Sequence, residues 1–328
     1  MIGDPPTLPV PLPRSMGLAK TAPTPVAIAL AGTAAENAWN EFLSAHIRNQ
    51  HTRTAYLRAV RQFLAWIEPL AVPLERITPA MVGEYFQQHP GSVPSRKLHL
   101  SALRSCFDIF VIRHVMVLNP AASVRGERYS VVEGKTPEIS KDHARRLIDS
   151  IDVTSAAGLR DRALLATLIY TSARDGAVAA LRISDYQFDG VQYSLRFTEK
   201  GGKSRLIPVR HDLQLFLCAY IGAIDPGLTR KDMPLFRAIA GRSGTLTSRP
   251  IRNVDIYRMM KRRLRDASLP NHFTPHSCRV ATITDLLAQG VPLEDVQHLA
   301  GHADPRTTRL YDRRKRQITR NTVERISI

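Results

Sequence analysis

Residues 274–311 read TPHSCRVATITDLLAQGVPLEDVQHLAGHADPRTTRLY, and the interpretation of the whole chain starts from this stretch. It holds His276 and Arg279 three positions apart, His302 directly after a glycine, and Tyr311 ahead of a run of basic residues. Residues three apart are neighbours on a helix surface, so His276 and Arg279 are expected on one face. The stretch therefore offers two imidazoles, a guanidinium and a phenol within a short length of chain.

The same stretch carries the start and stop signals of three short helices. Thr274 and Asp304 are each followed by proline, and both pairs predict a capped helix start. Gly290 and Gly301 predict helix ends, because glycine readily adopts the left-handed conformation that closes a helix. The third predicted helix carries Tyr311, so the three helices can bring the four functional side chains together.

These side chains suit chemistry on phosphate esters. A guanidinium presents a planar fork of donors that matches phosphate oxygens, and imidazoles donate to such oxygens or move protons. A tyrosine hydroxyl can attack phosphorus and form a covalent intermediate. No carboxylate cluster with metal-ligand spacing accompanies them in the sequence. We therefore expect no metal and no cofactor, with the phosphate charge met by cationic side chains.

The order His-x-x-Arg, Gly-His and Tyr resembles the C-terminal signature of the tyrosine recombinase (phage integrase) family. That family reads His-x-x-Arg, then Leu-Gly-His, then a nucleophilic Tyr about one helix later. Here the matches are His276 and Arg279, the sequence LAGH that ends at His302, and Tyr311. Taken singly, each residue could be an ordinary capping or core residue. In this order and at these spacings the set is specific.

The resemblance extends upstream to an arginine and a lysine. A strongly apolar helix is expected over residues 157–170, and the sequence TSAR follows it. The family places an arginine at this bend, which implies that Arg174 and Arg279 meet the scissile phosphate together. Residues 191–210 alternate like a β-hairpin around two glycines. The family carries a mobile lysine there, which implies that Lys200 is the general acid, with Lys203 as its rival.

Three positions depart from the family pattern. The family commonly reads His-x-Leu-Arg-His, whereas residues 278 and 280 are Cys and Val here. Neither change removes a catalytic group, so activity is still expected. The family also often places an acid three residues after the first arginine, where this chain has Ala177. Asp175 is acidic but is expected to point elsewhere, which leaves the support of Arg174 open.

Composition favours an anionic partner. The chain has 328 residues with 46 Lys plus Arg against 29 Asp plus Glu, a formal net charge of +17. Such an excess favours nucleic acid, although a solvated basic surface is the alternative. Three widely spaced cysteines without a CxxC pair argue against a disulfide framework and predict a reducing, cytoplasmic setting. No signal peptide or membrane segment is recognised.

The predicted fold is mainly α with a small β-hairpin or sheet, in two domains. A flexible arm rich in Pro and Ala is expected over residues 1–33, a helical domain over 34–123, a linker over 124–137, and a mixed α/β catalytic domain with a C-terminal tail over 138–328. The segment NQHTRTAYLRAVRQFLAW resembles the SAM-like core-binding domain of the same family. Basic or polar residues at helix starts and on helix faces are the candidate DNA contacts: Arg53, Thr54, Arg96, Lys97, Lys203, Lys261 and Arg262.

The resemblance implies a site-specific DNA recombinase. Tyr311 would form a 3′-phosphotyrosyl link, His276 would take its proton or donate to phosphate, and His302 would donate a further hydrogen bond. Four copies of the chain would assemble as a homotetramer on double-stranded DNA and exchange strands through a Holliday junction. Whether accessory DNA-bending proteins take part stays open.

Three other classes compete with this interpretation. A type IB topoisomerase uses the same tyrosine chemistry but rejoins the same strand. An inactive, integrase-derived DNA-binding protein would keep the basic surface without catalysis, and the full set of candidate catalytic residues argues against it. A metal-dependent nuclease is disfavoured because the sequence lacks a carboxylate cluster.

Overall fold

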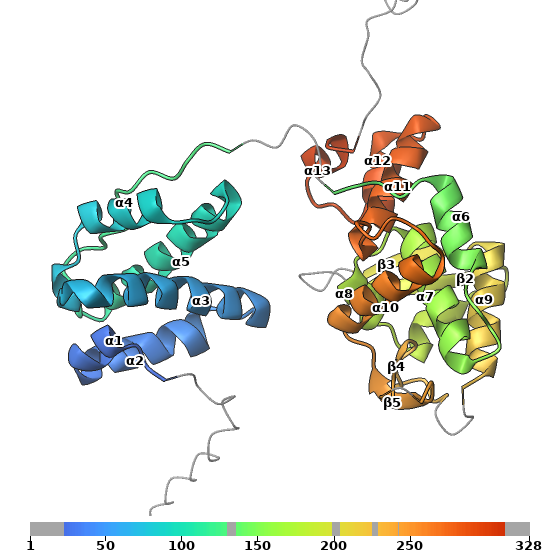
Figure 1. The fold of residues 1–328 in the computed structure, drawn as a ribbon, viewed down its shortest axis with the longest axis horizontal. Coiled ribbons are helices and arrows are strands. Elements are labelled where there is room, and N and C mark those ends of the chain that lie inside the picture. Colours follow the sequence, from blue (N-terminus) through green and yellow to red (C-terminus); the bar gives the residue numbers. More distant parts are fainter. Residues whose placement is uncertain (1–22, 130–135, 199–203, 225–228, 242, 312–328) are drawn as a thin grey trace, which may run out of the picture. The chain divides into compact units, whose positions relative to one another are not determined.

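The computed structural model describes residues 23–129, 136–198, 204–224, 229–241 and 243–311. They belong to two compact units that divide at residue 130 (Figure 1). The architecture is mainly helical with small antiparallel sheets, which confirms the predicted fold class. Among the described residues, no helix is both long and apolar enough to cross a membrane.

The N-terminal unit is a helical bundle. Its α-helices are α1 (Val26–Leu30), α2 (Thr33–Glu41), α3 (Gln50–Ile67), α4 (Pro79–Gln88) and α5 (Val93–Ile112). A π-helical turn, Phe42–His46, follows α2, and the short 3-10 turns Glu68–Leu70 and Leu74–Arg76 lie between α3 and α4. The aromatic residues of these helices form the core, as their helical spacing predicted.

The N-terminal unit extends beyond its predicted bounds at both ends. Residues 26–30 were expected in a flexible arm, but they form α1, and Ile28 is fully buried in the bundle core. The beginning of the expected linker is fastened to α5. There the Arg104 side chain donates to the carbonyl of Val124 at 2.5 Å, and Arg96 forms an ion pair with Glu127. Apolar burial, one hydrogen bond and one ion pair therefore hold segments that composition predicted to be flexible.

The C-terminal unit is built around α7 (Ala156–Thr171). This helix contacts α6 (Lys141–Asp149), α8 (Asp175–Ala179), α9 (His211–Gly222) and α11 (Pro275–Ala288). None of its residues is exposed, because neighbours cover the helix, and its buried residues include Leu164, Leu165 and Leu168. α7 is therefore the central helix of the unit, and it positions the elements that carry the site residues.

Two small sheets accompany the helices. The strands β1 (Tyr186–Phe188), β2 (Tyr193–Thr198) and β3 (Ser204–Pro208) form an antiparallel sheet in that order, entered through the 3-10 turn Ile183–Asp185. The β2–β3 pairing confirms the predicted hairpin, whose turn lies outside the described residues. A second hairpin, which the sequence did not predict, is formed by β4 (Arg237–Ile239) and β5 (Leu246–Pro250). Both strands are short, so they carry little of the alternating pattern by which strands are recognised.

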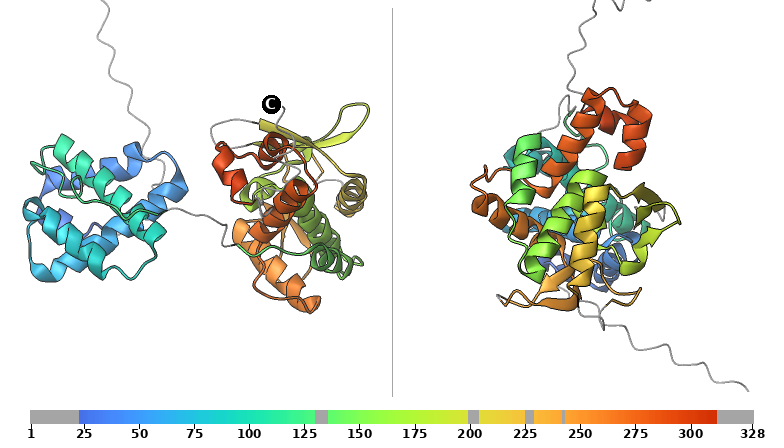
Figure 2. Two further views of the ribbon diagram at one scale, coloured as in Figure 1. Left: turned by 90° about the horizontal axis from the view of Figure 1, so that it is seen from above. Right: turned by 90° about the vertical axis from the view of Figure 1, so that its right-hand side faces the viewer.

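The remaining helices complete the unit. They are α10 (Asn253–Asp266), α12 (Leu293–Ala300) and α13 (Pro305–Arg309). Figures 1 and 2 show α11, α12 and α13 lying together, drawn in orange and red. These three helices share a small core of their own, which includes Val280, Ile283, Val296 and the ring of Tyr311. Residues 274–311 therefore fold as one packed group.

Candidate active site

Arg174 sits at a sharp bend between α7 and α8. Ser172 ends α7 in the left-handed conformation with φ 52°, and Arg174 is the residue that precedes α8. The backbone carbonyl of Ser172 accepts a hydrogen bond from the Arg279 side chain of α11. The bend therefore carries the first arginine and holds the second one in place.

Local signals at the start of α11 place His276 and Arg279 near the beginning of this helix, as predicted. Pro275 is the first residue of α11, and the backbone N–H of Thr274 donates to the Ser277 hydroxyl at 3.0 Å. Arg279 is 1% exposed. One turn earlier, His276 points its Nε2 atom at the Tyr311 hydroxyl, 3.3 Å away. The nucleophile candidate is thus in hydrogen-bond contact with a proton acceptor.

His302 and Tyr311 each lie two residues beyond the last residue of a helix, α12 and α13 respectively. The expectation that the third helix itself carries Tyr311 was wrong, because α13 ends at Arg309. Gly301 closes α12 with φ 64°, as its sequence position predicted, and the N–H of His302 donates to the carbonyl of Gln297 at 3.1 Å. The His302 and Tyr311 rings stack, with centroids 5.9 Å apart and planes 10° from parallel. His302 is 7% exposed and Tyr311 9%, so each ring is buried while it borders the site.

Both imidazoles are held neutral by their surroundings. Burial lowers the pKa of His276, the Arg279 and Arg174 charges lower it further, and the Asp175 charge opposes them. Burial and the same two arginines lower the pKa of His302 to about 3. These effects show that both guanidinium charges act on both imidazoles. The charge of Asp175 also acts on His276, while its carboxylate accepts a hydrogen bond from the backbone N–H of Gly176 at 2.9 Å.

Arg205 is a site residue that the sequence reasoning missed. It lies on β3, is 6% exposed, and its guanidinium carbon is 5.6 Å from the centre of the Phe197 ring. Its positive charge contributes to the lowered pKa of His302. The alternation of the predicted hairpin could have indicated that Arg205 is buried. Strand residues two apart share a face, and Arg205 lies two positions before the buried Ile207.

The other predicted site residues belong to the N-terminal unit or to α10, or are not described. Lys200 and Lys203 fall outside the described residues. In the N-terminal unit, Arg53 donates to the carbonyl of Ile47 at 2.8 Å, and Thr54 donates to that of Gln50 at 3.0 Å.

The last two predicted contacts of that unit sit at the start of α5. Arg96 pairs with Glu127 through two hydrogen bonds, of 2.5 and 2.9 Å. Lys97 is exposed. Among these four predicted contacts, Lys97 is the one whose charged side chain is exposed and forms no hydrogen bond or ion pair within the described part of the chain.

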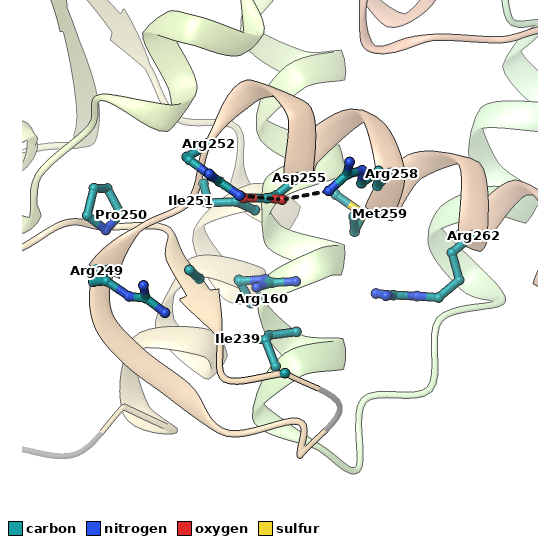
Figure 3. Close-up of a pocket in the computed structure, with 12 residues that line it drawn as sticks. Arg160, Ile239, Arg249, Pro250, Ile251, Arg252, Asp255, Arg258, Met259 and Arg262 are labelled. Atoms are coloured by element: carbon teal, nitrogen blue, oxygen red, sulfur yellow. Dashed lines mark hydrogen bonds and ion pairs between the residues drawn. The ribbon is translucent and has the colours of Figure 1, made fainter. Parts of the chain in front are cut away.

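A cationic cleft lies between α7, α10 and the β4–β5 hairpin. Its volume is about 400 Å³, and Figure 3 shows guanidinium groups from all three elements around it. The arginines that line it are Arg160, Arg249, Arg252, Arg258 and Arg262, with Asp255 as the acidic member. The predicted contact Arg262 belongs to this cleft. Lys261 faces elsewhere, since its ammonium group donates to the carbonyl of Asn271.

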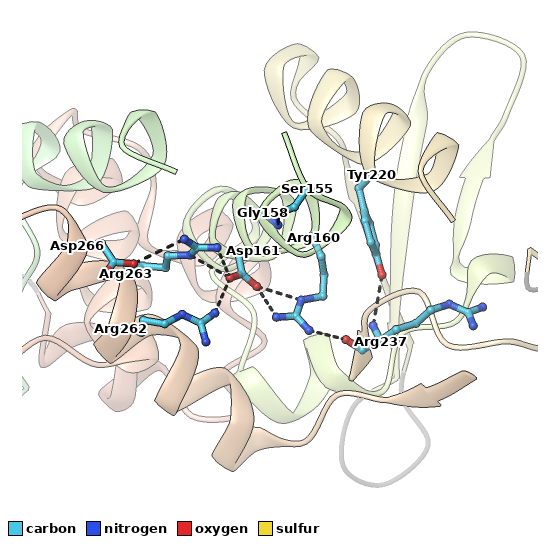
Figure 4. A network of polar contacts seen from close by, with 9 residues as sticks. All are labelled: Ser155, Gly158, Arg160, Asp161, Tyr220, Arg237, Arg262, Arg263 and Asp266. Atoms are coloured by element: carbon cyan, nitrogen blue, oxygen red, sulfur yellow. Dashed lines mark hydrogen bonds and ion pairs between the residues drawn. The ribbon is translucent and has the colours of Figure 1, made fainter. Parts of the chain in front are cut away.

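One buried carboxylate organises the deep side of the cleft (Figure 4). Asp161 is fully buried on α7 and accepts hydrogen bonds from Arg160 at 3.0 Å, Arg262 at 2.9 Å and Arg263 at 2.9 Å. Three guanidinium groups surround one carboxylate, so the cluster keeps an excess of positive charge. Two of these arginines, Arg160 and Arg262, also line the cleft, so the excess positive charge lies at its wall. The cleft is therefore suited to an anion.

The arrangement of these side chains suits nucleophilic attack on a phosphodiester. A tyrosine hydroxyl contacts an imidazole, and the charges of Arg279 and Arg174 act on that imidazole. Within the described residues, no group of His, Cys, Asp or Glu is arranged to hold a metal ion. Such a site suits an enzyme that cleaves a phosphodiester through a covalent link to tyrosine.

Comparison with known proteins gives the family. The model described as the Phage integrase family matches residues 137–317. The chain therefore belongs to the phage integrase family of tyrosine recombinases. Tyrosine recombinase XerD of Staphylococcus saprophyticus is 24% identical over 270 residues, which cover 80% of this chain and 88% of that protein. XerD of Staphylococcus aureus is 27% identical over 215 residues, covering 65% and 69%.

Solved structures share the fold. The XerH site-specific recombinase in a post-cleavage complex with a palindromic difH substrate has a TM-score of 0.63 at 18% identity, covering 79% of this chain and 75% of that one. A lambda integrase (75–356) dimer bound to a COC′ core site has a TM-score of 0.62 at 18% identity, covering 87% and 96%. These relatives are recombinases, so neither the topoisomerase nor the binding-only alternative is favoured.

Proposed function

We propose that this tyrosine recombinase cleaves and rejoins DNA at specific sites, with Tyr311 as the nucleophile. The Tyr311 oxygen attacks the scissile phosphorus, its proton passes to Nε2 of His276, and the bond from phosphorus to the 5′ oxygen breaks. The 5′ oxygen takes a proton from a general acid, for which family resemblance nominates Lys200. The 3.3 Å contact between the Tyr311 hydroxyl and His276 is the observation that carries this proposal.

The surrounding cations act on the charge that develops at phosphorus. Arg174 and Arg279 stabilise the non-bridging oxygens in the transition state, where preorganised donors have their largest effect. Arg205 adds a third positive charge near His302. The phosphotyrosyl link retains the energy of the cleaved phosphodiester bond. The 5′ hydroxyl of a partner strand can therefore reverse the step without ATP or a metal ion.

The DNA partner and the assembly follow from the same family. A lambda integrase tetramer has been solved on a Holliday junction, and it shares this fold with a TM-score of 0.60. We propose that four copies of this chain likewise exchange strands on two double-stranded sites. The N-terminal helical unit would act as a core-binding domain, and the arginine cleft beside α10 would contact the DNA backbone. Neutralising one backbone contact, Arg249→Ala, should reduce the salt slope of DNA binding by about 1.

A nicked suicide substrate tests the chemistry. The wild-type chain is expected to form a covalent DNA adduct that survives a denaturing gel, and Tyr311→Phe is expected to form none. Tyr193→Phe is the matched control, because Tyr193 is a half-buried tyrosine of the same unit on β2. An adduct that persists in Tyr311→Phe would show that another residue is the nucleophile. Rejoining to a new strand distinguishes a recombinase from a topoisomerase.

A further inference from the structure

Thr308 is the buried polar contact of His302, and it is not among the site residues predicted from the sequence. It lies on α13, is 0% exposed, and its hydroxyl oxygen is 2.8 Å from Nδ1 of His302. The backbone of His302 is fixed separately to α12, because its N–H donates to the carbonyl of Gln297 and its own carbonyl accepts from the Gln297 amide at 3.0 Å. The ring therefore meets α13 through Thr308.

The hydrogen bond decides which ring nitrogen carries the proton. A neutral imidazole has one N–H donor and one acceptor nitrogen. Within the described residues, the Thr308 hydroxyl has no other hydrogen-bond partner. If Nδ1 were the donor, the hydroxyl proton would be buried without an acceptor, which is costly. The arrangement that satisfies both groups has the Thr308 hydroxyl donating to Nδ1, and it leaves the proton on Nε2.

The position of Thr308 also links His302 to the nucleophile. The N–H of Tyr311 donates to the carbonyl of Thr308 at 3.0 Å, so the two residues belong to one helical turn. The Tyr311 ring stacks on the ring of His302. When α13 is docked, the nucleophile and the hydrogen bond to Nδ1 are therefore in place together.

We propose that Thr308 is a positioning residue that fixes His302 as a hydrogen-bond donor through Nε2. His302 is held in this state only when α13, the helix that carries Thr308 and precedes Tyr311, is docked. His302 then donates to a phosphate oxygen and does not compete with His276 for the Tyr311 proton. Burial and the neighbouring arginines keep the ring uncharged, so its tautomer matters. This inference rests on the proposed function, since it assigns a role within the same site.

Nuclear magnetic resonance tests the tautomer without requiring activity. Nitrogen-15 spectra of histidine-labelled full-length chain should show His302 with an unprotonated Nδ1 and a protonated Nε2, the resonances being assigned by their loss in His302→Gln. A protonated Nδ1 in the wild type would overturn the proposal. Thr308→Val, which removes the hydroxyl and keeps the shape, should shift the Nδ1 resonance. Thr307→Val is the matched control on the same helix, half-buried and one residue away.

Cleavage of the nicked substrate is the second readout. Thr308→Val should lower the single-turnover rate by about 10- to 100-fold, less than the loss of a transition-state donor outright (~10²–10³), with DNA affinity unchanged. Thr308→Ser should retain the wild-type rate, because it keeps the hydroxyl. An unaltered rate in Thr308→Val would refute the positioning role. If the wild type shows the expected tautomer but no cleavage, the proposed function fails while the assignment of the proton stands.

Discussion

Replacing Ser172 by glycine should stabilise the protein. Ser172 ends α7 at φ 52° and ψ 20°, is 0% exposed, and its hydroxyl has no hydrogen-bond partner among the described residues. A left-handed conformation costs a residue with a Cβ about 1–2 kcal/mol, and an unsatisfied buried hydroxyl costs roughly 1–3 kcal/mol. Both costs disappear in the Ser172→Gly variant.

Two opposing effects reduce the gain. Glycine gives the unfolded chain more conformational freedom, which lowers the free energy of unfolding by about 0.4–1 kcal/mol. The lost Cβ contacts lower it by about 1 kcal/mol more. We expect a net increase of about 1 kcal/mol in the free energy of unfolding, or roughly 2–4 °C in Tm for a domain of this size. The hydrogen bond from Arg279 to the Ser172 carbonyl is a backbone contact, so cleavage activity should survive.

Calorimetry on the full-length chain measures the effect, and Ser172→Ala is its control. The alanine variant removes the hydroxyl but keeps a Cβ at positive φ, so the two variants differ by the backbone strain minus the costs of chain freedom and lost Cβ contacts. Because these contributions nearly cancel, we expect the two variants to unfold within about 1 kcal/mol of each other. If glycine is less stable than alanine by about 1.4–2 kcal/mol, the sum of the two costs alone, the bend is not strained and the reasoning from the φ angle fails.

Three further predictions concern pH, buried charge and close packing. The unfolded chain binds a proton at His302 below the ordinary imidazole pKa of about 6.5, whereas the folded chain does so only near pH 3; Tm should fall as pH drops through this window, less steeply in His302→Gln. Asp161→Asn should cost about 3–5 kcal/mol in urea unfolding, since it leaves buried arginines uncompensated, whereas the half-exposed Asp266→Asn should cost under ~1 kcal/mol. Gly158→Ala should prevent stable folding, because its Cβ would lie 1.8 Å from the Asp152 carbonyl oxygen; Gly83→Ala, with open space, should gain about 0.5–1 kcal/mol.

Local signals in the sequence were enough to predict the helices that carry the site. Proline follows Thr274 and Asp304, and glycine closes the helices at residues 290 and 301, so each boundary is specified within a few residues. The structure has those boundaries. The charges of Arg174 and Arg279 act on both imidazoles, and the catalytic roles of these four residues stay predictions.

Contacts between distant segments could not be predicted in the same way. The bond from Arg279 to Ser172 joins residues 107 positions apart, and the pairing of Asp161 with Arg262 joins residues 101 apart. Nothing in the local sequence around Asp161 distinguishes a buried hub from a surface acid. The β4–β5 hairpin was missed for a related reason, because its strands are short and its stability comes from packing and pairing, not from periodicity.

The contact between Tyr311 and His276 lies within a single chain, and this has a consequence for mixtures of defective proteins. When a nucleophile is shared between subunits, two different inactive mutants can restore each other by combining their intact halves. Here the attacking oxygen, the imidazole and Arg279 belong to the same polypeptide. A mixture of Tyr311→Phe and Arg279→Ala chains should therefore remain as unable to cut DNA as either chain alone, and any recovered cleavage would reveal that the segment carrying Tyr311 can be exchanged between subunits.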